Sequence, residues 1–160
     1  MKTKIATKYH PNLRKYCKLN NLDILIYTGK KCQYCKSKTI ILTDHQLYRV
    51  GHDFKGKNYV CKKCDAHVKI YDGTNIGKGV VANWELRQLK YHTRQYFNNI
   101  CNKHMSLRAS STDEAVNNVY SWISKELQID RELTKMSLFT IQNCKDTLEL
   151  CKPFIEYKYN

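Results

Sequence analysis

Long apolar runs are absent from this sequence of 160 residues. No apolar stretch approaches the roughly 18 residues that a transmembrane helix requires, so we expect no membrane span. Residues 1–8 carry charge with no apolar segment behind them, so we expect no signal peptide. We therefore expect a cytoplasmic protein, in which cysteines serve as metal ligands or buried thiols rather than as disulfides.

Catalytic signatures are also lacking. The sequence contains neither the G-x-S-x-G motif nor the H-E-x-x-H motif, and no pair of carboxylates is marked out by its spacing. The glycines of residues 72–79 do not have phosphate-loop spacing, because Lys78 is followed by Gly79. A cysteine nucleophile with a distant histidine is an alternative, but nothing in the sequence nominates the pair. We therefore expect no enzymatic activity.

Acidic residues are few: 14 Asp and Glu face 28 Lys and Arg, for a net charge of +14. Residues 1–31 hold eight basic residues and one acid, and residues 32–82 hold nine and four. Residues 83–160 are nearly balanced, with eleven and nine. A basic front half indicates a polyanionic partner, either nucleic acid or an acidic protein surface. Solubility alone is the alternative explanation.

Eight cysteines are present, and four of them form two Cys-x-x-Cys pairs. The pairs are Cys32 with Cys35 and Cys61 with Cys64. Each pair places two sulfurs on one side of a tight loop, so two pairs supply the four corners of a tetrahedral zinc site. We predict one structural Zn²⁺ in a site closed by four thiolates. Two disulfides or four buried free thiols are the alternatives.

Other possible metal ligands lie outside these two pairs. Cys101 and His104 have ligand spacing, and Cys144 and Cys151 share one helical face, so together they form a possible second site. A helical core stripe also favours small apolar cysteines, which is the interpretation we prefer. His67 follows the second pair closely, but it is a poorer ligand than the four sulfurs.

Between the two cysteine pairs, the periodicity of apolar residues is closer to that of strands than of helices. Residues 11–19 indicate a short helix or a flexible basic arm, and residues 22–27 a strand or a packed segment. The expected strands between and after the cysteine pairs are residues 39–43, 46–50 and 67–71, with a turn at 44–45.

From Asn83 the period becomes helical. We expect a long helix over residues 84–104, a second one capped by Ser111, and a last one that begins after Thr140 and ends before Pro153. Residues 130–135 indicate a helical turn. The predicted fold is α+β: a small four-cysteine zinc ribbon of antiparallel strands followed by a three-helix C-terminal part. The predicted domains are a basic N-terminal arm (1–31), the zinc ribbon (32–82) and the helical part (83–160).

Several segments also resemble a known family. They are residues 32–37, Cys61 with 64–68, 73–75, 82–87, 115–127 and 139–144. In order and spacing, residues 32 to about 151 resemble an uncharacterised zinc-finger-containing domain family found in phages and prophages. The resemblance implies the four-cysteine zinc site and a phage-type protein acting in the cytoplasm of a host cell, and it implies no activity. The basic arm lies outside the resemblance, and the family carries no ligands at positions 101 and 104.

Basic residues concentrate beside the two cysteine pairs. We predict that the partner-binding residues are Lys30, Lys31, Tyr34, Lys36, Lys38, Lys62 and Lys63, with Tyr48 and Tyr59 as further stacking faces. We expect the partner to be nucleic acid or a host protein associated with nucleic acid. The alternative is a protein-binding inhibitor or modulator of a host factor, in host takeover or anti-defence. Both hypotheses predict the same basic surface.

Overall fold

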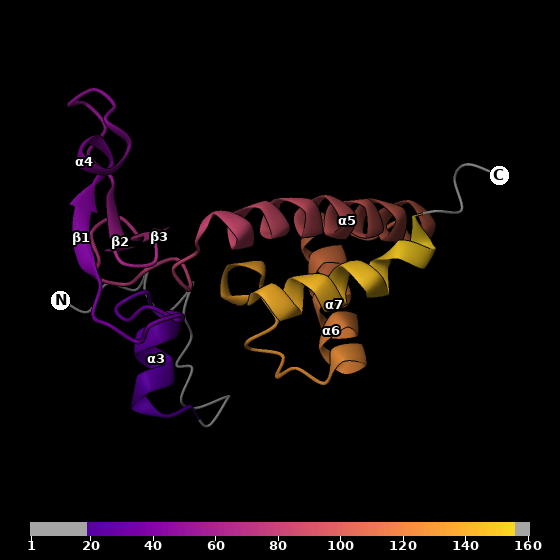
Figure 1. The fold of residues 1–160 in the computed structure, drawn as a ribbon. Helices are drawn as coiled ribbons and strands as arrows, with labels where there is room; N and C mark the ends of the chain where they lie inside the picture. The colour runs from indigo at the N-terminus through magenta and orange to yellow at the C-terminus, as the bar shows by residue number, and fades with distance from the viewer. Residues whose placement is uncertain (1–18, 156–160) are drawn as a thin grey trace. The chain divides into compact units, whose positions relative to one another are not determined.

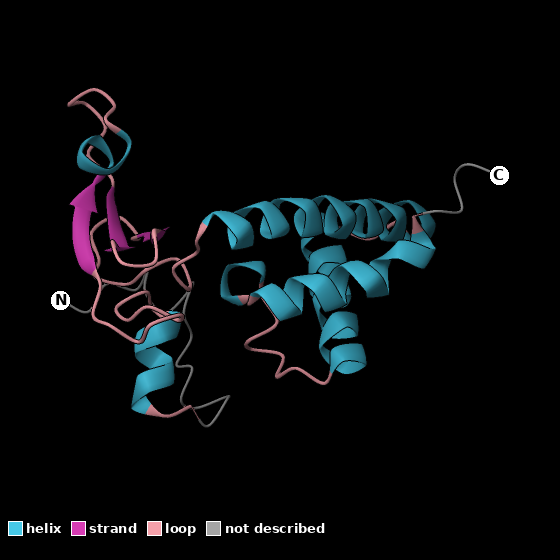
Figure 2. Cartoon of the chain, viewed as in Figure 1, coloured by secondary structure: helices cyan, strands magenta, loops and turns pink. Residues whose placement is uncertain are grey.

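The computed structural model describes residues 19–155, and the chain divides into two compact units after Trp84. The first unit contains α3 (Asn21–Tyr27), β1 (Ile40–Thr43), α4 (Asp44–Tyr48), β2 (Lys57–Cys61) and β3 (Ala66–Lys69) (Figure 1). The second contains α5 (Trp84–Arg108, whose first residue closes the first unit), α6 (Thr112–Leu127), η1 (Met136–Leu138), α7 (Ile141–Cys151) and η2 (Lys152–Phe154). The predicted α+β fold is confirmed, with a small antiparallel sheet first and helices afterwards (Figure 2).

The sheet of the first unit has three antiparallel strands in the order β1-β2-β3. On the central strand, Tyr59 lies opposite Ile41 on one side and Val68 on the other. Residues 58–61 of β2 are all buried, whereas β1 exposes its first two residues. Two isolated bridges, His67 to Ala82 and Ile70 to Gly77, continue the pairing beyond β3. The outer side of β1 has no paired strand among residues 19–155.

Two segments expected to be extended are helical instead. Residues 22–27 belong to α3, because the Asn20 side chain accepts a hydrogen bond from the Asp23 N–H at 2.8 Å and caps the helix. The strand expected over residues 46–50 was also wrong. A capping box between Thr43 and Gln46 starts α4 there, and Arg49 ends the helix in the left-handed region. In both places a local cap overrode an apolar pattern that was compatible with a strand.

The second unit consists mainly of helices, and two of them, α6 and α7, begin at a capping residue. α5 runs to Arg108, four residues beyond the expected end. Ser111 accepts a hydrogen bond from the Glu114 N–H and caps α6, and Thr140 forms a capping box with Asn143 at the start of α7. The buried side chains of these helices are Leu86, Thr93, Phe97, Cys101, Ala115, Val119, Ile123, Cys144, Thr147 and Cys151. Among the described residues, no helix combines the length and the hydropathy that a membrane span needs.

Candidate metal centre

The first cysteine pair sits in a tight loop that a single β-bridge closes. Lys31 pairs with Lys38 across this loop, and the Cys32 N–H donates to the Ser37 carbonyl at 2.9 Å. The Lys36 N–H donates back to the Cys32 carbonyl at 2.9 Å. To make this turn, Lys36 adopts a left-handed backbone with φ of 59°. The loop therefore turns directly after Cys35, which leaves both sulfurs on its inner side.

The second pair occupies the hairpin between β2 and β3. Cys61 ends β2 and lies opposite Ala66, so Cys64 falls within the connecting turn. Asp65 has a left-handed backbone with φ of 46°, as Lys36 does in the first loop. Both loops thus place a left-handed residue directly after their second cysteine, and the two turns have the same local construction.

The sulfur atoms of the four cysteines lie close together. The Sγ atoms of Cys32, Cys35, Cys61 and Cys64 all lie within 4.8 Å of one another. The Sγ atoms of Cys35 and Cys61 are 3.6 Å apart. A tetrahedron with Zn–S bonds of about 2.3 Å has sulfur–sulfur edges of about 3.8 Å. A disulfide requires about 2.05 Å, and all four cysteines are free thiols. The spacing fits four ligands around one ion and excludes the alternative of two disulfides.

The surroundings of the four sulfurs shift the pKa values of the cysteines in different directions. Hydrogen bonds from the Ser37 hydroxyl and backbone N–H lower the pKa of Cys35 to about 6. Burial, together with the neighbouring thiols, raises the pKa of Cys64 to about 12. Burial also raises the pKa of Cys32, against the opposing effect of the backbone N–H groups of Cys35 and Tyr34. Four sulfurs this close cannot all ionise beside one another unless a cation lies between them.

The donor set fits zinc. Four thiolates are soft ligands, and Zn²⁺ takes four of them in a tetrahedron without any electronic preference for another geometry. Cys32 and Cys61 are buried and belong to the apolar core of this unit, together with Tyr59, Ala66, Ile70 and Val81. A bound ion would therefore link the two cysteine loops to each other and to the apolar core of the first unit. It would have no ligand position open for water.

Sequence comparison agrees with this geometry. A family described as a zinc-finger-containing domain matches residues 28–153, which is most of the chain. The chain belongs to that family. No curated protein and no solved structure matches it. The match extends into both compact units and includes all four cysteines of the cluster.

Contacts from the segment after β3 hold the first loop of this zinc-finger domain in place. The Gln33 side-chain amide donates to the Val81 carbonyl at 2.6 Å. The Tyr34 hydroxyl donates to the Asn83 side-chain oxygen at 3.1 Å and accepts from the Asn83 N–H at 3.3 Å. Tyr34 is half-buried, and its hydroxyl links the first cysteine loop to the segment after β3.

The predicted lysines fall into two sets. Lys30, Lys31 and Lys38 line one cavity of about 740 Å³ beside β1. Lys36, Lys62 and Lys63 are exposed on the two cysteine loops. Sequence reasoning missed the apolar lining of this cavity, which is formed by Leu25, Ile40, Ile41 and Tyr59. The adjacent pair Ile40-Ile41 was visible in the sequence, but a strand pattern gives no sign that both of its faces stay open.

The other tyrosines and possible metal ligands that the sequence indicated lie outside the four-cysteine cluster. Tyr59 was predicted as a stacking face, but only 6% of its surface is exposed, and its hydroxyl donates to the Asn75 carbonyl at 2.6 Å. Tyr48 is exposed and its hydroxyl lies 3.0 Å from His67 Nε2. The ring of His104 contacts the Ser110 hydroxyl at 3.0 Å. Within residues 19–155, the four-cysteine cluster is the one group of three or more potential ligands.

Proposed function

We propose that this zinc-finger-containing domain is a phage-type accessory protein that binds nucleic acid through the basic surface of its first unit. One Zn²⁺ per chain, held by Cys32, Cys35, Cys61 and Cys64, has a structural role. The protein has no catalytic role of its own in this proposal, because a site closed by four thiolates leaves no position for a reacting water. It acts inside the host cell.

The lysine-lined cavity carries this proposal. Three cations, Lys30, Lys31 and Lys38, border a space of about 740 Å³. None of the described lining residues is acidic, so the positive charge in the cavity has no counter-charge there. Such a surface attracts phosphates and releases their counterions on binding. Lys36, Lys62 and Lys63 extend the basic surface over both cysteine loops.

The apolar lining of the cavity favours a single strand over a duplex. Leu25, Ile40 and Ile41 contribute apolar surface, and the two isoleucines expose 43% and 52% of their surface. Bases that are not paired can cover apolar side chains while neighbouring lysines hold the phosphates. A duplex presents its backbone outward and would leave this apolar lining uncovered. We therefore infer that the partner is single-stranded nucleic acid.

A protein partner is the second candidate, and the edge position of β1 favours it. The Thr39 N–H donates to the Lys30 carbonyl, and the Asp44 N–H donates to the Gly56 carbonyl beside β2. Because backbone groups alternate along a strand, those of Ile41 face the outer side, where an extended segment of another protein could pair with them. Acidic residues in that segment would match the lysines. In this case the protein would inhibit or modulate a host factor.

Salt dependence of binding tests the proposal. Affinity for a fluorescent single-stranded oligonucleotide is measured by anisotropy at several salt concentrations, using zinc-loaded full-length protein. Changing Lys30, Lys31 and Lys38 together to Ala should weaken binding and flatten the slope of log affinity against log salt by about 2, since each phosphate contact contributes about 0.7. The matched control changes three exposed lysines of the second unit, Lys103, Lys125 and Lys145.

Equal losses in the two triple variants would show that only net charge matters and would contradict the proposed cavity. No measurable binding by the unchanged protein at low salt would refute nucleic acid as the partner. An acidic polypeptide that binds with similar affinity and a similar salt dependence would favour the second candidate. A polypeptide has no phosphates, so such binding would show that the lysines do not require them.

A further inference from the structure

A second basic cavity lies entirely within the helical unit. It has a volume of about 340 Å³ and opens between α5, α6 and the segment that precedes α7. This volume falls in the range of about 300–1,000 Å³ that is usual for small-molecule sites. The polar and aromatic residues that line it are Arg94, Asn117, Tyr120, Arg131, Lys135 and Ser137. Sequence reasoning placed no site here, since this half of the chain is nearly neutral.

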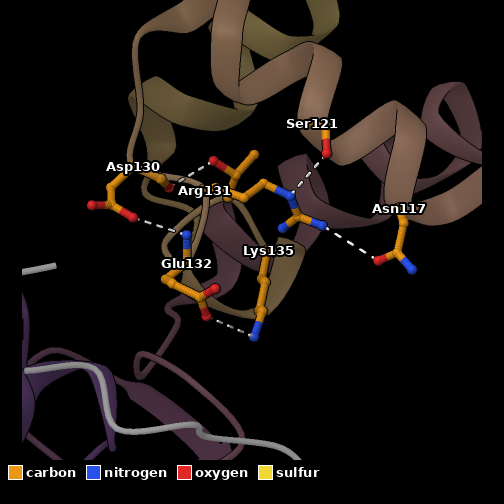
Figure 3. A network of polar contacts seen from close by, with 7 residues as sticks. Asn117, Ser121, Asp130, Arg131, Glu132 and Lys135 are labelled. Atoms are coloured by element: carbon orange, nitrogen blue, oxygen red, sulfur yellow. Dashed lines mark hydrogen bonds and ion pairs between the residues drawn. The ribbon is translucent and has the colours of Figure 1, made fainter. Parts of the chain in front are cut away.

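Arg131 is held in place by neutral groups. Its Nε donates to the Ser121 hydroxyl at 3.3 Å, and its Nη2 donates to the Asn117 side-chain oxygen at 3.4 Å. Figure 3 shows the guanidinium reaching toward both residues of α6. The guanidinium carbon also lies 5.5 Å from the centre of the Tyr120 ring. These contacts fix the orientation of the guanidinium without neutralising its charge, which leaves donors available to an anion.

Among the described residues, only one carboxylate is paired with a cation that lines this cavity. Glu132 lies 4.0 Å from the Lys135 amine, at the limit of an ion pair. The Asp130 carboxylate accepts from the Glu132 N–H at 2.9 Å and, in Figure 3, lies on the opposite side of the turn from the Arg131 guanidinium. Among the described residues, no carboxylate forms an ion pair with Arg94 or Arg131. Cations therefore outnumber carboxylates at this cavity.

A half-buried lysine adds to the positive charge. The Lys90 amine donates to the Ser137 carbonyl at 3.0 Å, directly behind the lining of the cavity. Burial lowers the pKa of Lys90 to about 8, and the positive charge of Arg94 acts in the same direction. An anion in the cavity would relieve this repulsion between like charges.

We propose that this cavity binds a phosphate group, with Arg94, Arg131 and Lys135 as the residues that hold its oxygens. Arg131 offers the planar donor pair that matches two phosphate oxygens. Lys135 adds charge from the same segment, and Arg94 adds charge from α5. Ser137 and Asn117 add polar groups to the lining. The phosphate belongs either to a free phosphate monoester or to a nucleic-acid backbone. The site stands on contacts of the second unit alone and does not depend on the lysine-lined cavity of the first.

Titration with inorganic phosphate tests this site. Zinc-loaded full-length protein is titrated at constant ionic strength, and the NMR signals of the backbone amides and of the arginine Nε–H groups are followed. We expect saturable shifts at Arg131 and Ser137. Arg94→Gln should weaken phosphate binding about tenfold, the usual effect of losing a charge-assisted contact. Arg94 is exposed and forms no side-chain hydrogen bond with residues 19–155, so this variant should fold. Arg131→Gln should weaken binding at least as much.

The matched control is Arg108→Gln, which removes the same charge from the exposed end of the same helix and should bind phosphate normally. A short single-stranded oligonucleotide that displaces phosphate in the unchanged protein, but not in Arg94→Gln, assigns the phosphate to a nucleic-acid backbone. Displacement by a mononucleotide alone assigns it to a small monoester. Absence of saturable shifts, or equal losses in Arg94→Gln and Arg108→Gln, would overturn the site. The Lys30, Lys31 and Lys38 variant should keep normal phosphate binding, so failure of one proposal leaves the other standing.

Discussion

The left-handed residue in the first cysteine loop gives a quantitative prediction. Lys36 adopts φ of 59°, which costs a residue with a side chain about 1–2 kcal/mol. Glycine carries no such penalty but loses about 0.5–1 kcal/mol more chain entropy on folding. The Lys36→Gly variant should therefore be more stable than Lys36→Ala by about 0.5–1 kcal/mol. For a unit of this size that raises the melting temperature by about 2–8 °C.

The assay is thermal unfolding of both zinc-loaded variants at one fixed zinc concentration, because bound metal shifts the apparent stability by mass action. Both variants lose the Lys36 charge and its hydrogen bond to the Gln33 carbonyl, so the difference between them isolates the backbone. Nucleic-acid affinity should fall by the same amount in both. A glycine variant whose melting temperature equals or falls below that of the alanine variant would refute the strained turn at position 36.

Further predictions concern the metal and the half-buried lysine, Lys90. Cys64→Ser should abolish stoichiometric zinc and unfold the first unit, since zinc contributes roughly 10 kcal/mol or more to the folding of such sites; elemental analysis and near-UV circular dichroism measure this. Replacing zinc with Co²⁺ should restore the fold and partner binding, and spectra that reveal a cobalt-bound water would contradict a closed site. The folded-state pKa of Lys90, about 8, lies below its ordinary value of 10.5, so the unfolded chain holds the extra proton above pH 8 and stability should rise with pH. Burial also raises the pKa values of Cys101, Cys144 and Cys151, which lowers stability in both proteins as the pH rises toward 9. Between pH 8 and 9, urea unfolding should therefore show the unchanged protein gaining about 1 kcal/mol relative to Lys90→Met.

The metal centre was predictable because its information is local. Two Cys-x-x-Cys pairs fix four ligands by chain spacing alone, and the structure brings the same four sulfurs within 4.8 Å. The three C-terminal helices were predictable for a similar reason, since Ser111 and Thr140 cap helices from adjacent positions. The strand expected after the second pair, over residues 67–71, corresponds to β3, whereas β2 before the pair was not among the expected strands.

Other features depend on contacts between distant residues. The exposure of Tyr59 could not be read from its neighbours, because Asn75 and the sheet cover it. The short helix α4 was not predicted, because the apolar pattern there is also compatible with a strand. The capping box from Thr43 to Gln46 was nevertheless present in the sequence. The basic cavity of the second unit joins Arg94 to residues near position 131, and a nearly neutral composition gave no sign of it.

The most direct measurement is recovery of the tagged full-length protein from the cells in which it acts, with and without nuclease treatment, followed by identification of what remains bound. Nucleic-acid binding predicts copurified nucleic acid that disappears after nuclease treatment and is depleted in the variant lacking Lys30, Lys31 and Lys38. The control variant lacking Lys103, Lys125 and Lys145 should retain it. A stoichiometric host protein that survives nuclease, with no nucleic acid enriched over the control, would contradict nucleic-acid binding as the primary function.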